Sequence, residues 1–245
     1  MVPDWQLPPG VDRGLWDYVS SERVAREYDD AIAGAPLLEA DLRFAARHFS
    51  SPGRLIDLGC GTGRLCLNFA ELGFSCVGVD LSEAMLDVLR AKAEQSNLSV
   101  ECMKANVVEL DGIPNANFDY AACLFSTLGM IRGRDNRNRF LSHVYRILKP
   151  GGRLVVHAHN AGYRFGPGLG RRGAERGDRV MPQHRGGADL TLHHFMRGEL
   201  LQDITRGGFR IIEIQPVSIQ PDAVLRQPWL ASRFRAYGYL VAAES

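Results

Sequence analysis

The stretch of sequence that decides the fold is residues 55–63, LIDLGCGTG. A short apolar run carries an acid near its end, and three glycines follow at every second position. Glycine permits a tight turn and leaves the backbone open to a ligand, because no Cβ stands in the way. Since the amphipathic segment 62–72 comes next, this stretch predicts a strand, a ligand-binding loop and a helix.

The same alternation of apolar runs and helical patterns continues along the chain. Ser82 precedes the apolar Met85 by three residues, which predicts a helix N-cap. Buried strands that alternate with helices of about 10 to 15 residues predict βαβ units and an α/β fold with a parallel sheet wrapped on both faces. The expected strands are 54–59, 74–80, 98–104, 118–125, 153–159, 190–195, 209–217 and 234–243, and the expected helices are two within 11–49, then 62–72, 83–95, 135–148 and 196–208.

The composition is that of an ordinary globular protein. With 245 residues, 45% apolar and 23% charged, the chain can bury a large core. The 29 basic and 28 acidic residues give a net charge of +1, which argues against a global nucleic-acid-binding surface. The five cysteines form no CxxC pair, so we expect neither a disulfide framework nor structural zinc. Without a signal-peptide pattern or an apolar run of about 18 residues, a cytoplasmic protein that does not enter a membrane is expected.

The acid Asp57 indicates which kind of ligand the loop accepts. In an open parallel sheet the ligand crevice lies beyond the carboxyl ends of the strands. The dinucleotide fingerprint GxGxxG would require glycine at position 64, where this chain has Arg64. At an effective dielectric of 20, a pyrophosphate about 4 Å from Asp57 would be repelled by roughly 4 kcal/mol. A ligand with a cationic centre would be attracted instead, so a nicotinamide oxidoreductase is the weaker alternative.

At this point the sequence resembles the class I S-adenosylmethionine-dependent methyltransferases, over roughly residues 50–160. Their loop is an acid followed by GxGxG, and their cofactor carries an ammonium and a sulfonium but no phosphate. The resemblance implies a doubly wound, mostly parallel seven-stranded sheet, S-adenosylmethionine as cofactor and S-adenosylhomocysteine as product. Within the family, the arrangement is most similar to small-molecule methyltransferases of the ubiquinone-biosynthesis type. The stretch HHFMRGEL (193–200) also resembles a segment of wobble-uridine tRNA methyltransferases.

The resemblance implies roles for particular residues. Asp57 would hold the amino group of the cofactor, and Asp80, at the end of the second strand, both ribose hydroxyls. Asn106 stands where many relatives have an aspartate that faces the adenine amino group, and its carbonyl preserves an acceptor. Tyr28, in REYDD, would close over the methionine end. The expected cofactor-binding residues are Tyr28, Asp57, Gly59, Cys60, Gly61, Gly63, Asp80, Leu81, Met85, Asn106, Val107, Leu124, Phe125 and Ser126.

The expected reaction is methyl transfer by in-line displacement at the sulfonium methyl. Because the positive sulfur already activates the methyl group, the protein mainly aligns the acceptor and excludes water. His159, at a strand end, is the candidate general base, since an unperturbed imidazole titrates near about pH 6.5. His157 is expected to pack within the sheet. No metal site is expected, because the histidines lack an HxxxH or carboxylate-linked spacing.

We expect one methyltransferase domain, formed by an N-terminal helical cap (1–49), a cofactor-binding core (50–159), a lid or substrate segment (160–196) and a C-terminal helix with strands (197–245). Residues 160–189 contain eight glycines and six arginines: Arg164, Arg171, Arg172, Arg176, Arg179 and Arg185. A loop this long without an apolar period is a functional lid or a solvated insertion. It could clamp a small anionic acceptor or contact RNA.

The sequence leaves the acceptor open. A small-molecule acceptor is the favoured interpretation, because Tyr163 and Phe165 are too few aromatics for a base-stacking platform. A tRNA or other RNA methyltransferase is the second candidate. A non-catalytic module that binds S-adenosylmethionine is the third, since its binding half would have the same sequence features.

Overall fold

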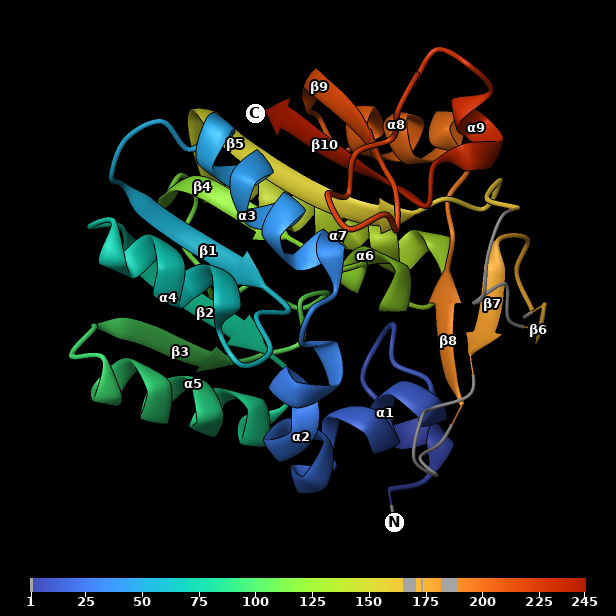
Figure 1. The fold of residues 1–245 in the computed structure, drawn as a ribbon. Coiled ribbons are helices and arrows are strands. Elements are labelled where there is room, and N and C mark those ends of the chain that lie inside the picture. The colour runs from blue at the N-terminus through green and yellow to red at the C-terminus, as the bar shows by residue number, and fades with distance from the viewer. Residues whose placement is uncertain (1, 165–170, 173, 182–188) are drawn as a thin grey trace.

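A seven-stranded sheet in the order β3-β2-β1-β4-β5-β10-β9 forms the centre of the computed structural model, which describes residues 2–164, 171–172, 174–181 and 189–245 (Figure 1). β10 runs antiparallel to both of its neighbours, and the other strand pairs are parallel. The strands are β1 Arg54–Leu58, β2 Ser75–Asp80, β3 Val100–Lys104, β4 Phe118–Cys123, β5 Leu148–His159, β9 Arg210–Val217 and β10 Gly238–Glu244. The predicted mostly parallel seven-stranded sheet is confirmed.

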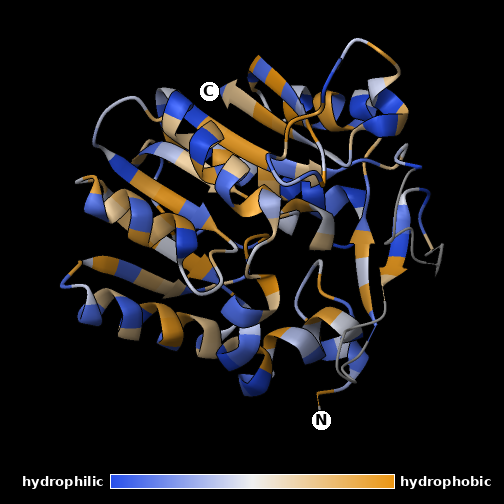
Figure 2. Ribbon diagram, viewed as in Figure 1, coloured by the Kyte–Doolittle hydropathy of each residue, from blue (hydrophilic) through white to orange (hydrophobic). Residues whose placement is uncertain are grey.

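Helices cover both faces of this sheet. Helices α3 to α5 pack on one face, and α7 and α8 pack on the other. Their bounds are α3 Pro36–His48, α4 Arg64–Glu71, α5 Glu83–Gln95, α7 Arg134–Ile147 and α8 Arg197–Arg206. Strand residues alternate between the two cores, so Leu55 faces α3 to α5 whereas Ile56 faces α7 and α8. Figure 2 shows hydrophobic residues along the central strands, whereas the helices alternate between hydrophobic and hydrophilic residues.

Three α-helices precede β1, where the sequence analysis expected two. A short 3₁₀-helix, η1 (Asp4–Gln6), is followed by α1 (Arg13–Val19), α2 (Glu22–Ile32) and then α3. The additional boundary has a local cause, because the Ser21 side chain accepts a hydrogen bond of 3.3 Å from Val24 N and so starts α2. Among the described residues, none of the helices combines the length and the apolar character needed to cross a membrane.

A second, small sheet takes two of its three strands from residues 160–189, where no strand was expected. It consists of β6 (Arg171–Arg172), β7 (Asp178–Met181) and β8 (Leu190–His193), all antiparallel. β8 contacts α1 and lies to the side of the main sheet (Figure 1). Only β8 was expected as a strand. Two short helices, α6 (Thr127–Met130) and α9 (Ser232–Arg235), were not expected, and Arg185 and Phe165 lie outside the described residues.

Gly63 has a packing role that a substitution can test. It precedes α4 at a φ of +86°, and a Cβ there would overlap the Leu89 side chain of α5. Gly34 has a similar φ of +75°, but nothing lies within 4 Å of its Cβ position. We expect Gly34→Ala to lose about 1 to 2 kcal/mol of unfolding free energy from backbone strain alone. Gly63→Ala should lose about 1 to 3 kcal/mol more, because it also overpacks the core.

Urea unfolding of the two variants beside the wild type measures this difference. An equal loss for both variants would contradict the close packing of Gly63 against Leu89.

Candidate active site

Three adjoining cavities open at the carboxyl ends of the strands, where open α/β sheets hold their ligands. The β2 cavity is lined by Asp80 at the end of β2. The Asp57 cavity lies beyond β1 and is lined by Asp57. The outer cavity lies between α2, α3 and the small sheet. Tyr28 and Phe125 line all three, so the cavities meet at these two rings.

Most of the expected cofactor-binding residues line the first two cavities. The expected residues that line the β2 cavity are Tyr28, Gly59, Gly61, Asp80, Leu81, Met85, Asn106, Val107 and Phe125. Those that line the Asp57 cavity are Tyr28, Asp57, Gly59, Cys60, Leu124 and Phe125. Gly63 and Ser126 line none of the three cavities. Gly63 packs against Leu89, and Ser126 is 1% exposed at a φ of +66°. These two residues shape the loops that carry the site.

Asp80 is fixed by the backbone at the mouth of the β2 cavity. Its Oδ2 accepts a hydrogen bond of 2.9 Å from Gly61 N, and its Oδ1 accepts one of 2.8 Å from Ser82 N. Burial raises the pKa of this carboxyl, while these backbone donors oppose the shift. A carboxylate oxygen has more than one acceptor site, so each oxygen can still accept a ligand hydroxyl.

The Asn106 amide forms three hydrogen bonds within the protein, which the sequence did not indicate. Its Nδ2 donates to Pro9 O at 2.9 Å and to Glu109 Oε2 at 3.0 Å. Its Oδ1 accepts from Val108 N at 3.1 Å, which leaves that oxygen one acceptor site for an adenine amino group. Asn106 therefore also ties the N-terminal segment to the edge of the β2 cavity.

Asp57 is a buried carboxyl with no ion-pair partner among the described residues. It is 4% exposed, and burial raises its pKa to about 7, an effect that the Arg64 guanidinium opposes and Asp80 increases. Cys66 Sγ lies 3.9 Å from Asp57 Oδ2. The Arg64 side chain instead pairs with Asp41 at 2.9 Å. A cation that entered this cavity would therefore find an unpaired acid.

Helix α2 closes over the glycine loop. A Cβ on Gly61 would lie 3.6 Å from the Tyr28 ring, which places that ring directly over the loop. The next residue, Asp29, accepts a hydrogen bond of 2.6 Å from Thr62 Oγ1 and pairs with Lys92 of α5. Burial raises the pKa of Tyr28 to about 12, so its hydroxyl stays protonated. Tyr28 and Asp29 thus join α2 to the glycine loop.

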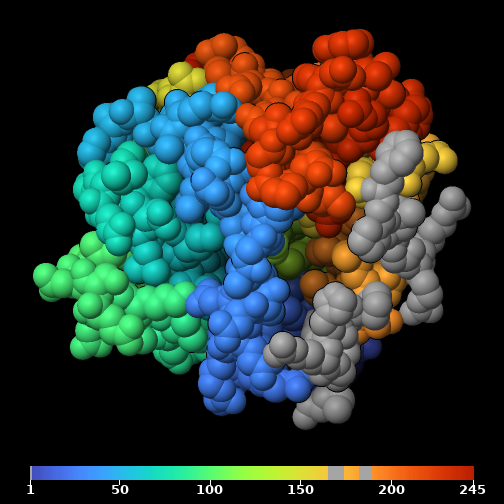
Figure 3. Space-filling view, in the orientation of Figure 1, coloured from blue at the N-terminus to red at the C-terminus, as the bar shows by residue number. Residues whose placement is uncertain are grey.

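The outer cavity is walled by residues from segments far apart in the sequence. Helices α2 and α3, the small sheet and the segment before β10 contribute Ile32, Leu37, Met181, Leu190, Leu192, Ile219 and Tyr237, among others. Figure 3 shows a hollow between the blue N-terminal helices and the red C-terminal segment. No local sequence pattern indicates these residues, because only the tertiary fold brings them together.

His159 lies at the end of β5 and lines the outer cavity. Its Nδ1 is buried and has no hydrogen-bond partner among the described residues. Burial lowers the pKa of His159 well below its usual range, and His157 and His194 add to this shift. The rings of Tyr237 and His194 lie 4.8 Å and 5.1 Å away. His159 is therefore neutral near pH 7, and its unpartnered Nδ1 is buried rather than open to the cavity.

His157 faces the same side of the sheet as His159 but is fully buried, as the sequence predicted. Its Nδ1 lies 2.7 Å from Asp41 Oδ1, and Asp41 also holds Arg64. This buried group of three side chains connects β5, α3 and the helix that follows the glycine loop.

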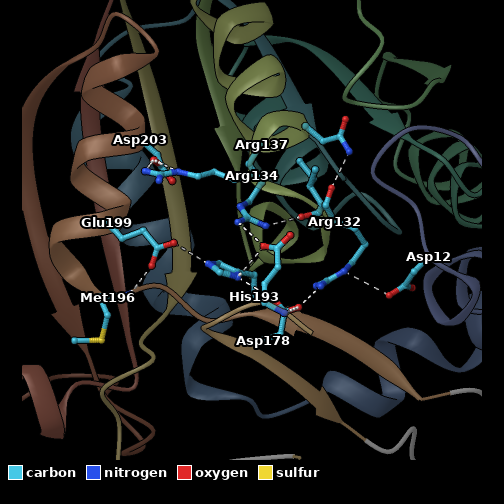
Figure 4. A network of polar contacts seen from close by, with 12 residues as sticks. Asp12, Arg132, Arg134, Arg137, Asp178, His193, Met196, Glu199 and Asp203 are labelled. Atoms are coloured by element: carbon cyan, nitrogen blue, oxygen red, sulfur yellow. Dashed lines mark hydrogen bonds and ion pairs between the residues drawn. The ribbon is translucent and has the colours of Figure 1, made fainter. Parts of the chain in front are cut away.

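A polar network holds the small sheet beside the outer cavity (Figure 4). His193 Nδ1 lies 2.9 Å from Asp178 Oδ1, and its Nε2 lies 3.0 Å from Glu199 Oε1 of α8. Arg132 pairs with Asp178 and, at 3.6 Å, with Asp12 at the start of α1. The network therefore links β7, β8, α8 and the N-terminal helices.

The same network contains a group of potential metal ligands, although the sequence predicted none. Glu175, Asp178 and His193 offer ligand atoms that lie within 4.8 Å of one another. Both carboxylates are already paired, Asp178 with Arg132 and Glu175 with Arg137. Since these arginines compensate the negative charge, we assign the group to the network.

Comparisons with known proteins show the family to which the chain belongs. Residues 55–152 match the family described as a methyltransferase domain. The ubiquinone biosynthesis O-methyltransferase of Brucella anthropi is 30% identical over 192 residues, which cover 78% of this chain and 72% of that protein. The chain spans only 54% to 57% of the length of three further curated relatives. One of them is the demethylmenaquinone methyltransferase of Thermus thermophilus, 36% identical over 124 residues, or 48% of this chain and 54% of that protein.

A solved structure shares the fold. The 1,6-didemethyltoxoflavin-N1-methyltransferase of Burkholderia thailandensis, with bound 1,6-didemethyltoxoflavin and S-adenosylhomocysteine, aligns with a TM-score of 0.67 at 21% identity. The alignment covers 94% of this chain and 86% of that chain. The chain belongs to the class I S-adenosylmethionine-dependent methyltransferases, a family of enzymes that use S-adenosylmethionine as their cofactor.

The position of Asp80 predicts a measurable effect on affinity. Asp80→Ala should weaken binding of S-adenosylhomocysteine by about 1.5 to 3 kcal/mol, because hydrogen bonds to a charged group are lost. Glu83→Ala is the matched control, since Glu83 is an exposed acid at the start of α5 that lines none of the three cavities. Isothermal titration calorimetry gives both affinities. Equal affinities for the two variants would contradict a ligand contact at Asp80.

Proposed function

We propose that this protein transfers a methyl group from S-adenosylmethionine to a small acceptor bound in the outer cavity. The observation that carries the proposal is the junction of the three cavities at Tyr28 and Phe125. A ligand that filled the β2 and Asp57 cavities would expose its central part to the outer cavity at this junction. Enclosing the reacting atoms in this way aligns them and excludes water, which supplies much of the rate of such a displacement.

In this proposal each cavity residue has a role toward the cofactor. Asp57 holds the amino group, and Arg64, which also lines the Asp57 cavity, faces the carboxylate of the methionine part. Asp80 accepts both ribose hydroxyls. The adenine lies among Leu81, Met85, Asn106 and Val107. The cofactor supplies a methyl group on a positively charged sulfur, so the protein needs few catalytic groups of its own.

The acceptor is held by the rest of the chain. Residues 50–159 form the cofactor-binding core, residues 1–49 the helical cap, residues 160–196 a segment that walls the acceptor, and residues 197–245 the remaining strands and helix, all within one domain. His159 receives the proton of an acceptor that must lose one. The position of the His159 side chain on the cavity wall supports this role.

A small-molecule acceptor is favoured over RNA. The outer cavity is walled largely by aliphatic and aromatic side chains, which suits an organic molecule rather than a phosphate backbone. The relative from Brucella anthropi is named an O-methyltransferase of ubiquinone biosynthesis, which supports a small acceptor in this chain as well. A module that binds the cofactor without catalysis would not require a second cavity at the junction.

Methyl transfer can be followed with S-adenosylmethionine that carries a radiolabelled methyl group. Protein is incubated with this cofactor and a bacterial extract, which is then separated into organic-soluble, nucleic-acid and protein fractions. We expect label in the organic-soluble fraction. Label confined to the nucleic-acid fraction would favour an RNA acceptor, and no label in any fraction would contradict catalysis.

The buried acid predicts how the affinity depends on pH. Free Asp57 has a pKa of about 7, and a bound ammonium group favours its charged form. The affinity should therefore be full above pH 7 and fall as Asp57 becomes protonated. Between about pH 7 and pH 5 the Kd of S-adenosylhomocysteine should rise roughly tenfold per pH unit. Asp57→Asn should bind more weakly with a flat profile, and a wild-type profile that is equally flat would contradict the role of Asp57.

A further inference from the structure

Arg64 is a cation beside Asp57 that does not pair with it. The two residues line the same cavity, and Arg64 is close enough for its guanidinium to oppose the rise in the pKa of Asp57 that burial causes. Arg64 forms its ion pair with Asp41 of α3 instead, at 2.9 Å between Nη2 and Oδ2. A carboxylate in a buried site gains most from a guanidinium when the two pair directly. The protein must therefore hold Arg64 in another direction.

Helix α3 sets the direction of the Arg64 side chain. Arg64 Nη1 donates to Leu38 O, and Nη2 donates to Asp41 Oδ2. The guanidinium is planar and its donors form a rigid fork, so two acceptors on different nitrogens define its orientation. Arg64 therefore points toward α3, although it begins the helix that follows the glycine loop.

His157 holds the other oxygen of the Asp41 carboxylate. Its Nδ1, on β5, lies 2.7 Å from Asp41 Oδ1. Both side chains are 0% exposed, so water does not replace either partner. Because one oxygen faces Arg64 and the other faces His157, the carboxylate cannot turn without losing a contact. Helix α3 and strand β5 together thus fix where Arg64 points.

The alternative arrangement, in which Arg64 pairs with Asp57, would close the site to a cationic ligand. An ammonium group would then have to displace a guanidinium before it reached the acid, and the two cations would repel each other at short distance. With Arg64 held by Asp41, the guanidinium keeps a carboxylate partner. Asp57 stays free for a partner that comes from outside.

We propose that Asp41, fixed by His157, is a positioning residue that holds the Arg64 guanidinium away from Asp57 and so reserves that acid for the ammonium group of the ligand. This inference rests on the proposed function, in which the cofactor supplies the ammonium. It concerns the affinity for the cofactor and not the transfer of the methyl group.

Three ligands separate the contributions to affinity. S-adenosylhomocysteine carries an ammonium and a carboxylate, decarboxylated S-adenosylhomocysteine carries only the ammonium, and methylthioadenosine carries neither. Isothermal titration calorimetry at about pH 8, where Asp57 is mainly charged, gives each affinity. We expect the wild type to bind decarboxylated S-adenosylhomocysteine at least about tenfold more tightly than methylthioadenosine, because only the former places a charge beside Asp57.

Asp41→Asn removes the charge that holds Arg64 and preserves the shape of the side chain. Arg64 should then turn to Asp57, and the affinity for decarboxylated S-adenosylhomocysteine should fall at least about tenfold. The affinity for methylthioadenosine should stay within about threefold of the wild-type value, since this ligand does not need Asp57. Equal losses for the two ligands would indicate a merely structural role and would overturn the inference, as would no loss for either.

Glu213→Gln is the matched control, because Glu213 also pairs with one arginine and one histidine, Arg47 and His48, and lines none of the three cavities. It should leave all three affinities unchanged. If Asp41→Asn does not fold, His157→Leu decides, since it frees the Asp41 carboxylate and keeps both charges. The affinity for decarboxylated S-adenosylhomocysteine should fall at least about threefold more than that for methylthioadenosine, and equal changes would overturn the inference.

A double-mutant cycle tests whether Asp41 acts through Arg64. Burial, Asp80 and Asp41 all raise the pKa of Asp57, so Asp41 could also act directly through its charge. In an Arg64→Met background there is no guanidinium to redirect, and Asp41→Asn should change the affinity for decarboxylated S-adenosylhomocysteine less than about twofold. A loss as large as in the wild-type background would contradict an action through Arg64.

The wild-type affinities separate the inference from the proposed function. If S-adenosylhomocysteine does not bind, or if decarboxylated S-adenosylhomocysteine binds no more tightly than methylthioadenosine, the proposed function loses its cofactor contact at Asp57. If the wild type prefers the ligand with the ammonium and the Asp41 and His157 variants keep this preference in full, only the positioning role of Asp41 is overturned.

Discussion

The site depends on one unfavourable arrangement, a carboxyl group buried at the end of the first strand without a cationic partner among the described residues. Asp57 is held there because β1 is an inner strand between β2 and β4, and the end of β1 shares a cavity with residues of α2 and α4. Burial raises its pKa to about 7, so this carboxyl is partly protonated near neutral pH in the free protein. An ammonium group brought by a ligand would restore the charged form.

Two polar connections hold the segments that surround this acid. Asp29 attaches α2 to the glycine loop through Thr62, and the Tyr28 ring lies over that loop. On the other side, Asp178 and His193 fix the small sheet against the N-terminal helices and α8. The three cavities that lie between these two connections meet at Tyr28 and Phe125. Phe125 links the glycine-loop side to the small-sheet side. This residue has a φ of +50°, a strained value of the kind that occurs at functional sites.

Local sequence patterns were sufficient for the sheet and for most of the expected residues that line the β2 and Asp57 cavities. The evidence for them lies in residues that are neighbours in the sequence, namely the apolar runs, the glycine loop and the acid at the end of the second strand. The structure has each of these features where the sequence predicts it. The third N-terminal helix was missed although Ser21 carries a capping signal, because the apolar period of the two helices is nearly continuous. β7 was missed because it is defined by pairing with β8 rather than by its own pattern. The outer cavity could not be predicted, since its wall combines α2, β5, β8 and the segment before β10. The hydrogen bond from Asn106 to Pro9 could not be predicted either, because these residues are far apart in the sequence.

The most direct measurement is a titration of the Asp57 side chain by ¹³C nuclear magnetic resonance, with carboxyl-labelled aspartate and Asp57→Asn to assign the signal. We predict a pKa of about 7 in the free protein, because the carboxyl is buried and has no ion-pair partner among the described residues. Saturation with S-adenosylhomocysteine should lower this value by at least about 2 pH units, because an ammonium group then lies beside the carboxylate. A pKa near about 4 in the free protein, or a value that S-adenosylhomocysteine leaves unchanged, would contradict the account.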